Sequence, residues 1–250
     1  MKSNIRNIYS DPAVYDAAHW WKTNDIEFVC DLISKYGDPV LELGAGTGRL
    51  AKPIMEKGLS HHGLDTSVEY VAWAKNKLKA FANLGTIDIG DMRNIKLDQT
   101  FQTCFIGFNS IFHLMTNDDI ESCFNSVYDH LADGGHFFFD MFLPDPSFLH
   151  RENIQHHVLD FDHPEGGKCT IKETNDYDEV TQVNAITWYF YRENRAEPDM
   201  YNFDMHMIYP DTIFRLLSET GFTIKHVWGD YDKSAMDEDG RLQFYVCQKL

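Results

Sequence analysis

An acidic side chain followed by three glycines is the first feature of this chain that could do chemistry. Glu42 precedes Gly44, Gly46 and Gly48 in the stretch VLELGAGTGRL at residues 40–50. The apolar residues predict a short buried strand, and the glycines predict a tight turn that lets a ligand approach the backbone. A helix expected at 47–56 would point its first amides at that ligand. In a doubly wound sheet, such a turn after the first strand binds a nucleotide.

The order of residues in this turn indicates which nucleotide is favoured. The dinucleotide pattern G-x-G-x-x-G requires a third glycine at position 49, where the chain has Arg49. The carboxylate of Glu42 would repel a pyrophosphate, whereas it suits an ammonium or a sulfonium group. An NAD(P)-dependent oxidoreductase is therefore the alternative interpretation rather than the favoured one.

Two further carboxylates follow expected strands. Asp65 ends a strand expected at 61–64, about 20 residues past the turn, where an acid hydrogen-bonds ribose hydroxyls. Asp91 follows a strand expected at 86–89 and can accept a hydrogen bond from an adenine amino group, with Met92 beside the ring.

Taken in order, these motifs resemble those of class I S-adenosylmethionine-dependent methyltransferases, over residues 40–143 and more loosely to the C-terminus. The resemblance implies a doubly wound, mostly parallel, seven-stranded α/β sheet (a Rossmann-like methyltransferase fold) and S-adenosyl-L-methionine as cofactor. It implies transfer of a methyl group to nitrogen or oxygen of a small polar molecule; a non-catalytic cofactor-binding protein of the same fold is a further alternative. The residues that it assigns to the cofactor are Tyr15, Trp20, Glu42, Gly44, Ala45, Gly46, Arg49, Asp65, Thr66, Asp91, Met92 and Asn109.

Two residues are candidates for catalysis. His113 follows the strand expected at 101–108, and its imidazole can accept a proton near neutral pH. Its segment SIFHL resembles the SIGHL of sugar-amine N-methyltransferases, whose histidine lies in the active site; a histidine satisfied by backbone groups is the other interpretation. The family also carries a tyrosine over the sulfonium in an N-terminal lid, and Tyr15 matches that position best, with Tyr9 second.

The alternation of strands and helices divides the chain. Residues 1–143 and 210–250 are expected to form the methyltransferase core, with one helix from Asp11 to Tyr36 and a final antiparallel pair at 222–227 and 242–248. Residues 144–209 carry four β-rich segments, at 155–163, 168–175, 180–192 and 200–209. They resemble the antiparallel insert that covers the acceptor site in small-molecule methyltransferases. The candidates for acceptor contact are Asp140, Trp188, Tyr191 and Tyr201, with structural packing or hydrogen bonding as the alternative for each.

Composition limits the partners. With 22 basic and 39 acidic residues, the net charge of −17 argues against nucleic acid and anionic membrane surfaces, because both require clustered Lys and Arg. Five scattered cysteines and the lack of an apolar leader predict a cytoplasmic protein with reduced thiols. The histidine groups lack zinc spacing, so no metal is expected. A small-molecule acceptor is the expected partner, and a homodimer is compatible with the sequence.

Overall fold

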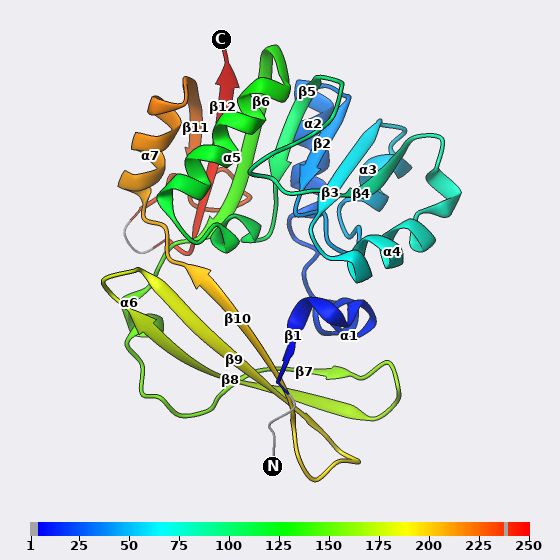
Figure 1. Cartoon of the computed structure of the whole chain (residues 1–250), viewed down its shortest axis with the longest axis vertical. Helices are drawn as coiled ribbons and strands as arrows, with labels where there is room; N and C mark the ends of the chain where they lie inside the picture. Colours follow the sequence, from blue (N-terminus) through cyan, green and yellow to red (C-terminus); the bar gives the residue numbers. More distant parts are fainter. Residues whose placement is uncertain (1–4, 238–239) are drawn as a thin grey trace. The chain divides into compact units, whose positions relative to one another are not determined.

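The computed structural model describes residues 5–237 and 240–250, which form two compact units (Figure 1). The core unit comprises 24–143 and 208–250, and the insert unit comprises the described residues up to Thr23 together with Pro144–Met207. Residues 1–4 lie outside the described residues; they belong to the N-terminal stretch in which the sequence analysis expected no apolar leader. Among the described residues, no helix has both the length and the apolar character needed to cross a bilayer.

The core unit is built on a seven-stranded sheet in the order β11-β12-β6-β5-β2-β3-β4 (Figure 1). Its strands are β2 (Val40–Leu43), β3 (His61–Asp65), β4 (Gly85–Ile89), β5 (Phe101–Ile106), β6 (Leu131–Phe142), β11 (Phe222–Trp228) and β12 (Leu242–Lys249). The strands from β2 to β6 are parallel, and β12 is antiparallel to both β6 and β11. The predicted fold class, including the final antiparallel pair, is confirmed.

Helices cover both faces of this sheet, as a mostly parallel sheet requires. They are α2 (Ile26–Tyr36), α3 (Ala51–Glu56), α4 (Val68–Lys77), α5 (Asn117–His130) and α7 (Pro210–Glu219), with 3₁₀ turns η2 (Lys79–Phe81) and η3 (Ser110–His113). Ile33 of α2 belongs to the same buried cluster as Phe138. Phe124 of α5 contacts Phe137 and Phe139 instead. Because successive strand residues point to opposite faces, the run of phenylalanines in β6 serves both helices.

The insert unit is a five-stranded sheet in the order β1-β10-β9-β8-β7. Its elements are β1 (Ile5–Asn7), η1 (Ile8–Ser10), α1 (Pro12–Ala18), α6 (Pro146–Leu149), β7 (His156–Asp162), β8 (Lys168–Asp178), β9 (Val183–Arg192) and β10 (Asp199–His206). The four expected strands are present and antiparallel. The N-terminal segment, expected in the core, belongs here, because β1 pairs in parallel with β10. The boundary of the core unit predicted from the sequence therefore differs from the boundary in the structure, where the core unit begins at Asn24.

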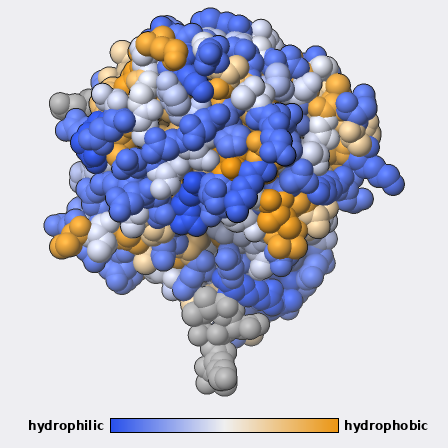
Figure 2. All heavy atoms as spheres, turned by 45° about the horizontal axis from the view of Figure 1, so that its top comes forward, coloured by the Kyte–Doolittle hydropathy of each residue, from blue (hydrophilic) through white to orange (hydrophobic). Residues whose placement is uncertain are grey.

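The single helix expected from Asp11 to Tyr36 is wrong, because two helices occupy that region. Asp11 caps α1 as expected, accepting from the amide of Val14 at 3.2 Å, and α2 ends at Gly37, whose φ is 98°. Between them, α1 stops at Ala18 and α2 restarts at Ile26. The face drawn in Figure 2 is largely hydrophilic, with hydrophobic residues in separate small groups.

Candidate active site

The glycine turn joins β2 to α3 where β2 and β5 end side by side. Gly44, Gly46 and Gly48 have φ angles of 70°, 55° and 76°, which L side chains rarely adopt. A Cβ at Gly44 would lie 2.8 Å from Cβ of Ser110, which follows β5. The chain order reverses between β2 and β5, and ligands of doubly wound sheets bind at such a switch point. Both backbone conformation and close approach therefore require the glycine at position 44.

Three backbone amides of this turn donate hydrogen bonds within the protein. Those of Gly44 and Ala45 donate to the carbonyl of Leu64 at 2.9 and 3.0 Å, and that of Gly46 donates to Oδ2 of Asp65 at 2.8 Å. The helix expected from position 47 begins only at Ala51, so a turn rather than the first helical residues follows Gly46. A bound pyrophosphate would accept hydrogen bonds from such amides. Here the amide of Gly46 donates to the carboxylate of Asp65 instead. The turn thus disfavours a dinucleotide.

Asp65 stands at the C-terminal end of β3 and fixes two backbone segments. Its Oδ1 accepts from the amide of Ser67 at 2.8 Å, while Oδ2 binds the glycine turn. Burial raises the pKa of Asp65, and the backbone hydrogen bonds from Ser67 and Gly46 oppose that effect. Each carboxylate oxygen has a second lone pair, so the same group can also accept from ribose hydroxyls. Thr66 beside it is exposed.

Asp91 is held by its neighbour Arg93, whose Nη2 lies 2.6 Å from its Oδ2. The hydrogen bond from Arg93 lowers the pKa of Asp91 and so keeps an ionised acceptor at the end of β4. Arg93 in turn contacts Asp119 at 2.9 Å. Cε of Met92 would lie 3.6 Å from a Cβ at Gly44, so Met92 and the glycine turn are neighbours, as the adenine assignment requires.

Glu42 is buried and pairs with a histidine of the neighbouring strand. Its Oε2 lies 2.7 Å from Nε2 of His61, and both side chains are buried. His61 pairs with Val40 in the register of β2 and β3, so the carboxylate of Glu42 leans back toward the start of the strand. The expected contact of Glu42 with the methionine part of the cofactor stays a prediction. Sequence spacing alone gave no sign of His61, because the contact depends on strand register.

Asn109 and Asp140 hold the turn that follows β5. Phe108 and Asn109 both have left-handed φ angles, 54° and 64°. Oδ1 of Asp140 accepts from the amide of Phe108 at 2.8 Å, and Oδ1 of Asn109 accepts from the amide of Phe142 at 2.8 Å. His113, the expected catalytic residue, ends the η3 turn that follows and is exposed.

Three other residues expected at the cofactor have different surroundings. Arg49 donates to both carboxylate oxygens of Asp25 at 2.8 Å, and Asp25 is almost fully buried. Ala45 is buried in a cluster with Val71. Trp20 is 67% exposed and belongs to the insert unit. Arg49 therefore links the glycine turn to α2.

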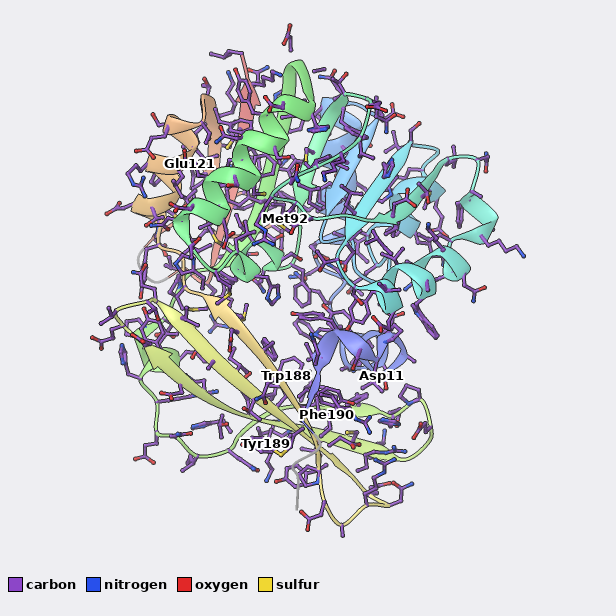
Figure 3. All side chains as sticks on the ribbon, in the orientation of Figure 1. Asp11, Met92, Glu121, Trp188, Tyr189 and Phe190 are labelled. Carbon is purple, nitrogen blue, oxygen red and sulfur yellow. The ribbon has the colours of Figure 1, made fainter. Side chains whose placement is uncertain are left out.

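The insert unit has a pocket of its own between α1 and the sheet. Its lining residues are Ile8, Asp11, Val14, Tyr15, Ala18, His19, Trp188, Phe190 and Tyr201, of which Asp11, Trp188 and Phe190 are labelled in Figure 3. The rings of Tyr15 and His19 are 4.0 Å apart, and those of His19 and Trp188 are stacked at 6.0 Å. The structure thus brings together Tyr15, Trp188 and Tyr201 from the expected set.

Tyr191 does not share this pocket. Successive residues of β9 face opposite sides, and the phenol of Tyr191 donates to Gln155 at 2.9 Å, away from the face of Trp188 and Phe190. His19 was missed by the sequence analysis, although Asp11, Tyr15 and His19 recur at every fourth position. Within the described ranges, no three His, Cys, Asp or Glu side chains are grouped to hold a metal ion.

Comparison with known proteins agrees with this geometry. The family described as "Methyltransferase domain" matches residues 40–135. A Geobacillus sp. (strain WCH70) protein with a provisional methyltransferase name is 23% identical, covering 95% of this chain and 94% of that one. An uncharacterized methyltransferase of Anoxybacillus flavithermus is 30% identical over 48% of this chain and 53% of its own.

Solved structures share the fold. The CcbJ methyltransferase from Streptomyces caelestis superimposes with a TM-score of 0.83 at 20% identity, over 97% of this chain and 98% of that one. An amino pentose methyltransferase of calicheamicin biosynthesis from Micromonospora echinaspora, solved with S-adenosylmethionine bound, has a TM-score of 0.72 at 19% identity, over 98% and 99%. Residues 40–135 thus match a methyltransferase domain, and the chain has the fold of S-adenosylmethionine-dependent methyltransferases.

Proposed function

We propose that this enzyme transfers the methyl group of S-adenosyl-L-methionine to the nitrogen of a small amine. The observation that carries the choice of cofactor is the contact of Asp65 with the glycine turn, because it puts a carboxylate where a dinucleotide would need its pyrophosphate. The choice of an amine rests on the resemblance of SIFHL to sugar-amine N-methyltransferases and on structural neighbours that methylate an amino pentose or a sugar nitrogen.

In this proposal the core unit binds the cofactor. Asp65 accepts from the ribose hydroxyls, Asp91 accepts from the adenine amino group, and Gly44 and Gly46 make room for the methionine part. The bound cofactor supplies a methyl group already activated by its sulfonium. The protein's contribution is then alignment, which is worth about 7–11 kcal/mol of the barrier at the upper end.

The acceptor side uses His113 and the aromatic pocket. An amine is protonated near neutral pH and must lose a proton to attack, and the exposed imidazole of His113 is suited to accept it. Tyr15 is proposed to lie beside the transferring methyl group. Aromatic ring faces attract cations, and the insert unit groups the rings of Tyr15, Trp188 and Tyr201, which supports an ammonium-bearing acceptor.

The cofactor is tested first, by thermal unfolding with S-adenosylhomocysteine or NAD. At 100 times its dissociation constant a ligand stabilises the folded state by about 2.7 kcal/mol, so S-adenosylhomocysteine should raise the melting temperature and NAD should not. A shift with NAD alone would contradict the proposal.

The acceptor class is tested with the wild-type enzyme, S-adenosylmethionine and matched panels of primary amines and alcohols. We expect methylated amines by mass spectrometry, and His113→Ala should lower turnover by about 10²–10⁴ while S-adenosylhomocysteine still binds. His157→Ala is the control, since that histidine is also exposed. Methylation of alcohols alone would overturn the amine assignment, and unchanged turnover in His113→Ala would overturn the role of the base.

A further inference from the structure

The turn that leads from β5 to His113 is held from outside by a pair of residues that no motif identifies. We infer that Asp140 and Tyr231 act together as positioning residues for methyl transfer, by fixing the left-handed turn Phe108–Asn109 from which the segment Ser110–His113 starts. The catalytic consequence rests on the proposed function, whereas the contacts themselves do not.

The turn has a conformation that needs support. Two consecutive residues with side chains, Phe108 and Asn109, adopt φ angles of 54° and 64°. Such angles are sparsely populated by residues other than glycine and persist only when the surroundings impose them. Ser110, the next residue, lies close to Gly44.

Asp140 supplies much of that support from the adjacent strand β6. Its Oδ1 accepts from the amide of Phe108 at 2.8 Å, and its backbone carbonyl accepts from the amide of Asn109 at 3.3 Å. The residue is 4% exposed. Asp140 thus fixes two successive peptide groups of the turn, one through its buried carboxylate and one through its backbone carbonyl.

Tyr231 holds the other carboxylate oxygen. Its hydroxyl donates to Oδ2 of Asp140 at 2.8 Å. Its ring lies 5.5 Å from that of Phe28 and 6.2 Å from that of Phe244, so the phenol is fixed by α2 and β12. Burial and the charge of Asp140 raise the pKa of Tyr231, which keeps the hydroxyl a donor.

These contacts tie the loop after β11 to the reacting end of β5. If the phenol is lost, Oδ2 of Asp140 loses this donor and the carboxylate is freer to rotate away from Phe108. His113 is five residues further along, and displacement of a reacting group by about 1 Å can cost roughly 10²-fold in rate. Asp140 and Tyr231 therefore affect the rate of methyl transfer indirectly, by fixing the geometry of the turn that leads to His113.

The test compares Tyr231→Phe with Tyr245→Phe. Tyr245 is a matched control, because its buried hydroxyl also donates one hydrogen bond, to Gln243 at 2.9 Å, but from the middle of β12. With the amine identified in the panel, Tyr231→Phe should lower kcat by about 10- to 100-fold with the affinity for S-adenosylhomocysteine within about twofold. Tyr245→Phe should keep the wild-type kcat. Equal kcat values in the two variants would overturn the inference.

One further measurement separates this inference from the proposed function. Hydrogen exchange of the peptide containing Phe108–Ser110 should be faster in Tyr231→Phe and unchanged in Tyr245→Phe, whether or not any amine is methylated. Unchanged exchange in Tyr231→Phe would overturn the inference, whereas a wild-type enzyme that methylates no amine would overturn only the proposed function. Asp140→Asn, which can keep both side-chain hydrogen bonds, should retain more activity than Asp140→Ala, and equal losses would count against the inference.

Discussion

Gly44 combines two constraints at one residue, and they can be separated by experiment. Gly44→Ala should destabilise the protein by more than the roughly 1–2 kcal/mol of left-handed strain, because its Cβ would also meet Ser110 at 2.8 Å. Gly58→Ala is the control: its φ is 81°, but no atom lies within 4 Å of the added Cβ. Urea unfolding measures both, and calorimetry should find weaker S-adenosylhomocysteine binding only in Gly44→Ala. Equal destabilisation in both variants would contradict the close approach.

Asp65 and Asp91 should respond differently to acid. The pKa of Asp65 is raised above its ordinary value of 3.8 by burial, whereas that of Asp91 is lowered by Arg93. If the ionised Asp65 accepts from ribose, affinity for S-adenosylhomocysteine falls as the pH drops through the raised pKa, at a pH above 3.8. Titration calorimetry across the acidic range measures this step. Asp65→Asn should abolish it and Asp91→Asn should leave it, and a step that survives in Asp65→Asn contradicts the assignment.

Residues near strand ends were predictable to different extents. Asp65, Asp91 and the glycines follow apolar runs at spacings that the fold dictates, so their places at the switch point could be expected. The side-chain partners of Glu42 and Asp140 could not be predicted, because these partners, His61 and Tyr231, are 19 and 91 residues away in the chain. Such contacts depend on strand register and loop placement, which composition and spacing do not encode.

At the scale of elements, residues 19–25 separate the helices α1 and α2, and the last of these residues bonds outside the helix that follows. Asp25, next to the start of α2, makes no side-chain bond to the helix and pairs with Arg49 of the glycine turn instead. Apolar spacing continued through this segment, so the pattern predicted one helix. The alternating strands of the insert were predictable because one face is buried, whereas β1 is three residues long and carries no pattern.

The ion pair between Asp25 and Arg49 should therefore contribute to the free energy of unfolding by holding α2 to the glycine turn. Arg49→Met leaves a carboxylate buried without its bidentate partner, and breaking a buried pair in this way costs about 3–5 kcal/mol. The double variant Asp25→Asn with Arg49→Met removes the charge as well and should recover a large part of that loss. Urea unfolding of the wild type, both single variants and the double variant gives the coupling. A loss below about 1 kcal/mol in Arg49→Met would show that the pair is not needed to hold α2.

For the whole molecule, the division into two units gives the proposal its sharpest test. The residues proposed to bind the cofactor include Gly44, Asp65 and Asp91 of the core unit, whereas Tyr15 belongs to the insert unit. Hydrogen exchange with S-adenosylhomocysteine at about 100 times its dissociation constant should slow exchange in the peptides around all four residues, since the ligand stabilises every segment that closes on it. The peptide containing Trp228 is an internal control, because β11 lies at the edge of the sheet away from β2. Protection of the core peptides alone would remove Tyr15 from the site and leave the cofactor assignment standing, whereas protection of none would remove both.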